Sequence, residues 1–172
     1  SPQSPTLYQV VFETTDDALS DRVGFRTVET RGEDILLNGE PIFLRGICLH
    51  EEEIGEAPVR NMTPEAAERL LRIAKDDLHC NFVRLAHYPH TETTVRLADE
   101  IGLMVWSEIP VYWRIDWESA ETLTTARRML AENIQRDRNR AAIILWSVGN
   151  ETPLSEARNS FMQTLVADAR RL

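Results

Sequence analysis

The sequence has few cysteines and no long apolar run, and each scarcity excludes a class of protein. Cys48 and Cys80 are the only two cysteines among 172 residues, and neither has a His or a second Cys at metal-ligand spacing. A zinc site or a redox pair is therefore not predicted, and we expect two buried thiols. No apolar stretch approaches the ~20 residues that a membrane span needs.

Positive charge is also sparse, because 19 basic side chains stand against 28 acidic ones and the formal charge is −9. Lys75 is the only lysine, and no cluster of arginines is long enough to form a phosphate-binding stripe. Neither nucleic acid nor an anionic membrane is a predicted partner. The first five residues do not form a signal peptide, and the compartment, bacterial cytoplasm or periplasm, stays open.

What the sequence does contain is an ordinary supply of core residues, since 42% are apolar and 27% are charged. A domain of about 150 residues can bury roughly 68–70% of its unfolded surface, so no metal or disulfide is needed to stabilise it. Near the start, residues 7–12 and 22–30 have strand-like patterns. The pair Asn38-Gly39 between two apolar triplets predicts a β-hairpin with a type I′ turn.

After this hairpin, short apolar segments alternate with helical stretches. We expect strands over 46–49, 81–85, 103–106 and 142–146, and helices over 63–79, 92–101, 119–138 and 155–171. Such a β/α repeat is typical of parallel strands covered by helices. The pattern does not decide between an open sheet and a closed barrel.

Two helix ends carry specific signals. Thr63 can cap the first helix, with Pro64 at its first position, where a missing N–H costs nothing. Gly102 ends the second helix as a C′ glycine would, directly before a strand.

Reactive side chains follow each expected parallel strand, where α/β domains bind their ligands. The four segments are His50-Glu51-Glu52-Glu53, Ala86-His87-Tyr88-Pro89-His90, Ser107-Glu108-Ile109-Pro110 and Ser147-Val148-Gly149-Asn150-Glu151. The segments that precede the strands are poorer in acids and aromatic residues. This asymmetry favours an active-site rim.

Several motifs in order resemble glycoside hydrolase family 2, the β-galactosidase and β-glucuronidase family. They are Gly24-Phe25-Arg26, Leu37-Asn38-Gly39-Glu40-Pro41, Leu44-Arg45-Gly46, His50-Glu51, Asn81-Phe82-Val83-Arg84-Leu85-Ala86-His87-Tyr88-Pro89, Trp106-Ser107-Glu108 and Trp146-Ser147-Val148-Gly149-Asn150-Glu151. The resemblance implies a (β/α)8 TIM barrel preceded by β-sandwich domains. We therefore interpret 1–31 as the end of an immunoglobulin-like β-sandwich domain or a linker, and 32–172 as the N-terminal half of a catalytic barrel, with about four β/α units.

The resemblance also implies retaining hydrolysis of β-linked sugars by two glutamates. Glu151 matches the general acid/base, which protonates the departing oxygen and later deprotonates water. The alternative is a cap or first-turn acid of the following helix. Asn150 resembles the residue that binds the sugar 2-hydroxyl, the alternative being a turn asparagine.

Other residues match substrate contacts. His50 and His87 resemble substrate-contacting histidines, although His87 could instead be a buried residue that fixes the turn after it. Trp113 and Trp117 are the best candidates for stacking on a pyranose ring, whereas the strand residues Trp106 and Trp146 more often belong to the core.

Arg84 falls within a buried strand, where a guanidinium needs a carboxylate partner. By resemblance that partner is the nucleophile. Glu108 would lie next to Glu151, and some β-galactosidases use this glutamate and a histidine two residues on to bind magnesium. Because Pro110 replaces that histidine, we expect Glu108 to be a supporting or sugar-contacting acid, with no metal and no cofactor.

The nucleophile should lie roughly 5–5.5 Å from the acid/base, and the family places it on the seventh barrel strand. A complete barrel has about 250 residues, so we expect a fragment with little or no turnover. The alternative is a non-catalytic half-barrel that binds carbohydrate or forms a homo-oligomer through open sheet edges. A Cys- or Ser-dependent hydrolase has little support, since no Gly-x-Ser-x-Gly elbow occurs.

Overall fold

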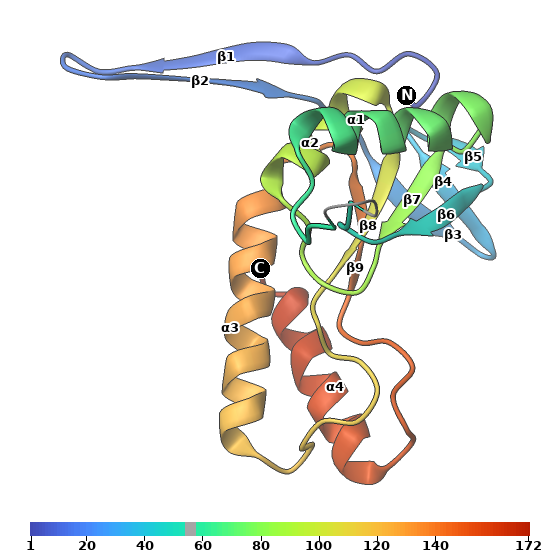
Figure 1. The fold of residues 1–172 in the computed structure, drawn as a ribbon, viewed down its shortest axis with the longest axis vertical. Coiled ribbons are helices and arrows are strands. Elements are labelled where there is room, and N and C mark those ends of the chain that lie inside the picture. Colours follow the sequence, from blue (N-terminus) through green and yellow to red (C-terminus); the bar gives the residue numbers. More distant parts are fainter. Residues whose placement is uncertain (54–57) are drawn as a thin grey trace.

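The computed structural model describes residues 1–53 and 58–172, and its centre is a parallel sheet of four strands (Figure 1). The strands lie side by side in sequence order: β6 (Gly46–Leu49), β7 (Phe82–Leu85), β8 (Met104–Glu108) and β9 (Ile143–Ser147). Each expected parallel strand is confirmed within one or two residues. All four carboxyl ends therefore lie at the same edge of the sheet.

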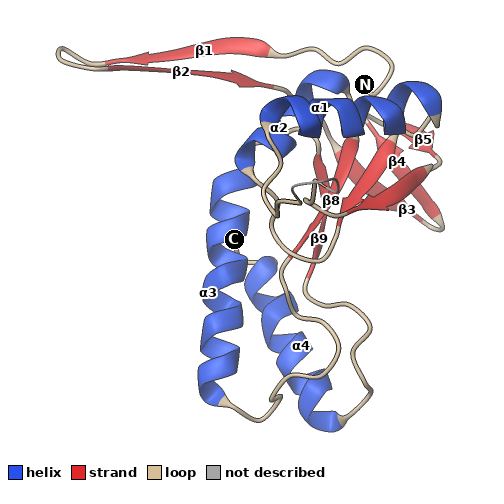
Figure 2. Ribbon diagram, in the orientation of Figure 1, coloured by secondary structure: helices blue, strands red, loops and turns tan. Residues whose placement is uncertain are grey.

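Helices connect these strands (Figure 2). They are α1 (Pro64–Arg72), which continues into the π-helical turn η1 (Ile73–Asp77), α2 (Glu92–Ile101), α3 (Ala120–Asp137) and α4 (Glu156–Ala169). The expected caps are confirmed, since the Thr63 side chain accepts a hydrogen bond from the N–H of Ala66 and Gly102 ends α2 with φ 79°. Over the described residues, no helix combines the length and apolar character needed to span a membrane.

The two faces of the parallel sheet have different surroundings. Val83, Leu85 and Val105 are fully buried in a core that includes residues of α1 and α2. On the opposite face, Phe82 and Met104 pack with Leu37 of the amino-terminal hairpin. That second face is therefore closed near the amino ends of the strands, where the hairpin lies, and its polar residues gather near the carboxyl ends.

The hairpin belongs to an antiparallel sheet of three strands: β3 (Val28–Arg31), β4 (Asp34–Leu37) and β5 (Glu40–Ile42). The turn between β4 and β5 has φ 54° at Asn38 and φ 84° at Gly39, as a type I′ turn requires, so the sequence prediction is confirmed. Another positive-φ glycine, Gly32, turns the chain between β3 and β4.

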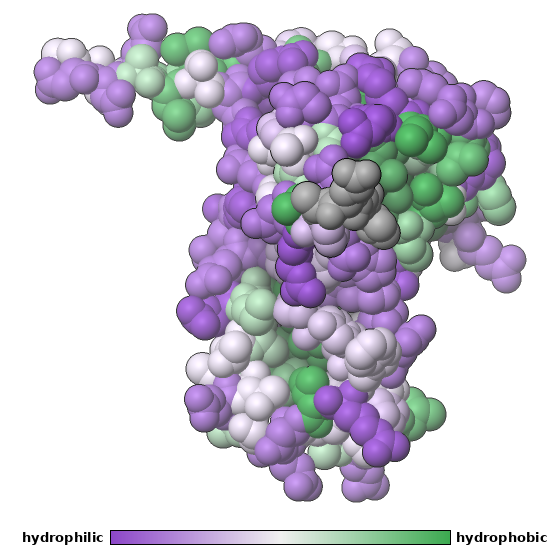
Figure 3. All heavy atoms as spheres, in the orientation of Figure 1, coloured by the Kyte–Doolittle hydropathy of each residue, from purple (hydrophilic) through white to green (hydrophobic). Residues whose placement is uncertain are grey.

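A two-stranded ribbon projects from the body of the molecule (Figure 1). It consists of β1 (Tyr8–Glu13) and β2 (Ala18–Val23), so the expected strand over 22–30 is divided between two sheets. Phe12 and Leu19 are paired on this ribbon and are both more than 60% exposed. Figure 3 shows hydrophobic residues on the ribbon among hydrophilic ones.

One of the two cysteine predictions is wrong. Cys80 is buried, but Cys48 is exposed. Cys48 lies on β6 in register with Arg84 of β7, on the sheet face that the helices do not cover. The apolar pattern around it predicts a strand correctly but does not reveal which face of that strand is open.

Candidate active site

Four polar side chains from three neighbouring strand ends form one hydrogen-bonded network. The guanidinium of Arg84 donates to Oε2 of Glu108, from Nε at 3.0 Å and from Nη2 at 2.7 Å. Nη2 also donates to Oδ1 of Asn150 at 2.8 Å. The other oxygen of Glu108 lies 2.5 Å from Nδ1 of His87. We call Arg84, His87, Glu108 and Asn150 the carboxyl-end network.

Strand register explains why these residues meet. Arg84 of β7 is paired with Trp106 of β8, and Glu108 lies two residues further along on the same face. The Arg84 guanidinium carbon lies 4.4 Å from the centre of the Trp106 ring, a cation–π contact. The expectation that Arg84 has a carboxylate partner is confirmed, and in this structure that partner is Glu108.

Glu108 is buried far more deeply than its partners. Its side chain is 1% exposed, against 18% for Arg84 and 26% for His87. An ionised carboxylate at that depth requires charge-assisted hydrogen bonds. The network supplies them on both oxygens.

The histidines predicted to contact substrate lie together. The rings of His50 and His87 meet edge to face with centroids 5.3 Å apart, and His50 is exposed. The buried carboxylate of Glu51, directly after His50, accepts hydrogen bonds from Thr91 and Thr94 at the start of α2. The loop after β6 is therefore fastened to the loop after β7.

Glu151 and Trp113 form a second contact beside the network. The indole N–H of Trp113 donates to Oε2 of Glu151 at 3.0 Å, and the backbone N–H of Trp113 donates to the carbonyl of Asn150 at 3.1 Å. Both residues are exposed and have positive φ, 56° for Trp113 and 48° for Glu151. Ser155 caps α4, so the alternative of Glu151 as a helix cap is wrong.

Two further tryptophans, Trp117 and Trp146, are less exposed than Trp113. Trp117, the other stacking candidate, is partly buried and packs edge to face on Phe161 at 5.2 Å against the core beside α3 and α4, so its role in stacking stays a prediction. Trp146 packs against the helix-covered core, as expected. Trp113 and Trp117 both follow β8, but the first indole is exposed and the second packs on Phe161. Residue type alone does not distinguish them.

Sequence reasoning assigned no role to His90 or to Glu51. His90 is 2% exposed, its Nε2 lies 3.1 Å from the carbonyl of Ala86, and burial lowers the pKa of its imidazole. It stacks on Tyr88, whose hydroxyl oxygen accepts a hydrogen bond from the backbone N–H of Glu51. These contacts support the loop that carries His87, and spacing alone gave no signal for them.

The residues at this edge do not fit a magnesium ion. Both oxygens of Glu108 accept hydrogen bonds from Arg84 or His87, and the Pro110 side chain offers no ligand atom. Within 1–53 and 58–172, no group of three or more His, Cys, Asp or Glu side chains could hold a metal.

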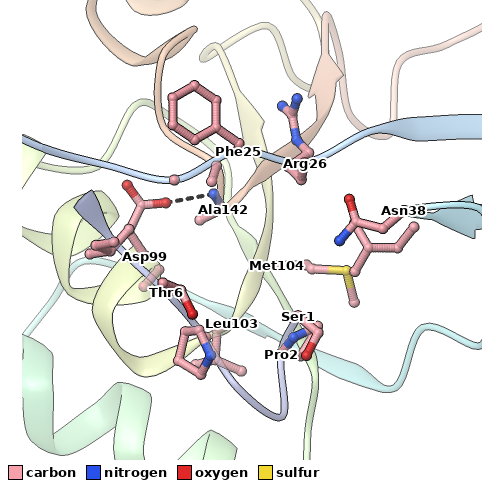
Figure 4. A pocket seen from close by; sticks show the side chains of 17 residues that line it. Ser1, Pro2, Thr6, Phe25, Arg26, Asn38, Asp99, Leu103, Met104 and Ala142 are labelled. Carbon is pink, nitrogen blue, oxygen red and sulfur yellow. Dashed lines mark hydrogen bonds between the residues drawn. The ribbon is translucent and has the colours of Figure 1, made fainter.

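A separate cavity lies at the other end of the sheet (Figure 4). Its volume is about 70 Å³, and it is lined by the amino-terminal segment and by residues such as Phe25, Asp99 and Met104. None of the seven predicted site residues lines it. Its lining is mainly apolar, so the chemistry lies at the carboxyl ends and not in this cavity.

A parallel β/α sheet that presents an acid, an amide and two histidines at its carboxyl ends is typical of α/β enzyme domains, which include the TIM barrels. The family model "Glycosyl hydrolases family 2, TIM barrel domain" matches residues 28–172. The chain therefore belongs to glycoside hydrolase family 2. Its curated relatives are glycoside hydrolases.

Three relatives illustrate the match. A β-galactosidase of Thermoanaerobacterium thermosulfurigenes is 34% identical over 151 residues, which are 84% of this chain and 20% of that protein. A solved β-glucuronidase of Parabacteroides merdae has a TM-score of 0.84 at 33% identity over 99% of this chain and 22% of that one. A β-glucuronidase of Ruminococcus gnavus, solved with a C6-substituted uronic isofagomine, has a TM-score of 0.86 at 28% identity, covering 96% and 30%. The chain thus spans about a fifth of its curated relatives' length.

Proposed function

We propose that this chain carries the acid/base half of a retaining β-glycosidase site, with Glu151 as the general acid/base. The observation that carries the proposal is the contact between Glu151 and Trp113, adjacent to Asn150 of the carboxyl-end network. A retaining mechanism needs one carboxyl group that first donates and then accepts a proton at the glycosidic oxygen. Glu151 is exposed at this edge, so a substrate can reach it.

The neighbouring residues take the remaining roles in the proposal. Asn150 binds the sugar 2-hydroxyl, His50 and His87 contact other hydroxyl groups, and the exposed face of the Trp113 indole offers apolar surface to the ring. Arg84 and Glu108 support these groups. No metal or cofactor takes part, because the only carboxylate in the network is already engaged by Arg84 and His87.

The nucleophile of the proposed reaction is a second carboxylate outside these 172 residues. The four parallel strands correspond in the proposal to the first half of a (β/α)8 barrel, and the segment 1–31 to the end of a β-sandwich domain or a linker. The 172-residue chain alone then binds a β-glycoside mimic but turns it over slowly or not at all.

The proposal predicts binding without turnover. Hydrolysis of 4-nitrophenyl β-D-glucuronide and β-D-galactoside is measured with the 172-residue chain, and uronic isofagomine is titrated while tryptophan fluorescence is recorded. We expect no hydrolysis and a saturable fluorescence change. Glu151→Ala should weaken the affinity measured from this change by about tenfold. Turnover that Glu151→Ala abolishes would show that the nucleophile lies within the chain. No binding by the folded chain would contradict the assigned site.

A second candidate function is self-association of a half-barrel. It is favoured by the sheet order, in which β6 and β9 each pair with one neighbour and so have a free edge within the described residues. Light scattering at several concentrations measures the mass. A dimer that does not bind uronic isofagomine would favour this second function over the first.

A further inference from the structure

We infer that Glu108 is a positioning residue that fixes both the tautomer of His87 and, through Arg84, the orientation of the Asn150 amide. The inference deepens the proposed function, since it states which hydrogen-bonding atoms the site offers to a sugar. Glu108 itself touches no substrate in this proposal, because it is 1% exposed and lies behind the side chains it orients.

The first step concerns Glu108. Oε2 accepts two hydrogen bonds from Arg84, and Oε1 accepts one from His87. Since an ionised carboxylate can only accept, every neighbour in contact with it must present a donor. The charge of Glu108 therefore dictates the donor pattern of the groups around it.

The second step concerns His87. Its Nδ1 lies 2.5 Å from Oε1 of Glu108, so Nδ1 must carry the proton. The same nitrogen is 3.5 Å from Nη2 of Arg84, but the two hydrogens on Nη2 are already donated to Glu108 and Asn150. In the described part of the chain Nε2 has no protein partner, and in the neutral ring it is an acceptor.

The third step concerns Asn150. An amide can turn either its oxygen or its nitrogen toward a neighbour, and the guanidinium of Arg84 accepts nothing. Oδ1 must therefore face Arg84, as it does at 2.8 Å. The amide nitrogen, which makes no hydrogen bond to any described residue, is left to donate outward.

The combined result is a fixed pattern at the strand ends. Nε2 of His87 accepts from a ligand hydroxyl, and the amide nitrogen of Asn150 donates to a ligand oxygen. A polyhydroxylated ring, whose hydroxyl groups both donate and accept, matches this pair. Without Glu108, the His87 proton is free to move to Nε2, and Arg84 loses the partner that holds it against Asn150.

The test uses ¹⁵N-labelled 172-residue chain, whose imidazole tautomers are visible in long-range ¹H–¹⁵N NMR spectra. In the wild type, in spectra recorded where the imidazole is neutral, we expect the His87 proton on Nδ1. In Glu108→Gln one of the two acceptor oxygens is replaced by an NH2 group, which only donates, so the side chain cannot accept on both sides from Arg84 and His87. We expect a substantial population of His87 protonated on Nε2 and about tenfold weaker binding of uronic isofagomine, which corresponds to the loss of about one hydrogen bond.

Two further variants keep the test informative. Asp168→Asn removes a carboxylate that pairs with Arg127 between α3 and α4, far from His87 in sequence and structure, and should leave the tautomer unchanged. Arg84→Lys keeps the positive charge and the Glu108–His87 contact, so it should leave the tautomer unchanged but shift the Asn150 side-chain amide signals. If Glu108→Gln does not fold, the wild-type tautomer of His87 and the Asn150 shift in Arg84→Lys remain as two separate readouts.

A wild-type His87 protonated on Nε2, or a Glu108→Gln spectrum identical to the wild type, would overturn the inference. Because the tautomer is read without turnover, these results are independent of the glycosidase proposal. If the tautomer depends on Glu108 but no β-glycoside mimic binds, the positioning role stands and the proposed function fails.

Discussion

Two arginine–carboxylate clusters lie at opposite ends of the parallel sheet, and only one of them has the features of a functional site. The carboxyl-end network joins Arg84, Glu108, His87 and Asn150. The other, which we call the amino-end cluster, joins Asp21 of β2 with Arg96, Asp99 and Arg140. Both contain a buried carboxylate and a nearly buried arginine, so burial and pairing alone do not separate them.

The amino-end cluster connects elements that are far apart in the sequence. Asp21 of the ribbon accepts hydrogen bonds from Arg96 of α2 and from Arg140 before β9. The hydrogen bond from Arg140, partly offset by burial, holds the pKa of Asp21 well below its usual range. Arg140 is 5% exposed and also donates to the carbonyl of Arg22. These contacts fasten the base of the ribbon to the body.

The difference between the clusters lies in the atoms that remain unused. The carboxyl-end network leaves an imidazole nitrogen and an amide nitrogen beside the exposed Glu151. The amino-end cluster uses its charged groups to join β2, α2 and the start of β9, and the atoms that it leaves without a hydrogen bond to a described residue, Oδ2 of Asp99 and Nε of Arg140, are buried. We conclude that unused hydrogen-bonding atoms on an open face indicate a binding site better than charge pairing does.

The largest expected effect is that of Glu108→Ala, which breaks the carboxyl-end network. It leaves the Arg84 guanidinium without a carboxylate, and removing one partner of a buried pair typically costs about 3–5 kcal/mol. Because Arg84 is 18% exposed, we expect a loss near the lower limit, about 3 kcal/mol. Urea denaturation measures it. A loss below about 1 kcal/mol would show that the network contributes little to stability.

Asp21→Ala breaks the other cluster and should cost about 2 kcal/mol, less than Glu108→Ala, because Arg140 retains Asp99 at 3.8 Å. Binding of uronic isofagomine should not change. The stability that Asp21 contributes is present above its ordinary pKa of 3.8 and is lost as the pH falls below that value, because its folded-state pKa is lowered. Denaturation at pH 3, 5 and 7 tests this dependence, and an altered ligand affinity would contradict the separation of the clusters.

Asp99→Asn, in the same cluster, should raise the stability of the protein, whereas Asp21→Ala should lower it. Burial raises the pKa of Asp99 to about 6, although Oδ1 accepts the N–H of Ala142. Between about pH 4 and 6 the folded state holds a proton that the unfolded state has released, so stability from this group falls as the pH rises. The asparagine keeps the oxygen acceptor and removes the charge. We expect the variant to be about 2 kcal/mol more stable than the wild type at pH 8 and equally stable at pH 3.5. A uniform loss of stability at both pH values would contradict this.

Trp113→Phe should have the smallest effect on stability. The indole is 63% exposed, and surface substitutions usually change stability by less than about 0.5 kcal/mol. Ligand affinity should fall severalfold, because the hydrogen bond that positions Glu151 is lost. Trp117→Phe, in the core beside Phe161, is the matched control. It should lower stability more than Trp113→Phe and leave ligand affinity unchanged.

Local signals predicted most of the fold. The Asn38-Gly39 turn, the Thr63 cap and the Gly102 helix end each depend on neighbouring residues, and each is confirmed. The burial of Arg84 also predicted a carboxylate partner correctly, but spacing did not identify Glu108 as that partner. Local chemistry thus determines where elements begin and end.

The features that sequence reasoning missed depend on long-range packing. Asp21 and Arg140 are 119 residues apart in sequence, and no local pattern relates them. Cys48 was misplaced because a residue's type does not show which side of a strand is covered. The hydrogen bond between Trp113 and Glu151 depends on the positive φ of both residues, which neither motif indicated.

NMR chemical-shift mapping of the 172-residue chain with uronic isofagomine tests the central claim most directly. The ligand should shift the imidazole signals of His50 and His87 and the indole signal of Trp113. Signals of Arg96, Asp99 and Arg140 at the amino end should stay unchanged. Shifts confined to the amino end, or no shifts in the folded chain at millimolar ligand, would contradict the assignment of the carboxyl ends as the sugar site.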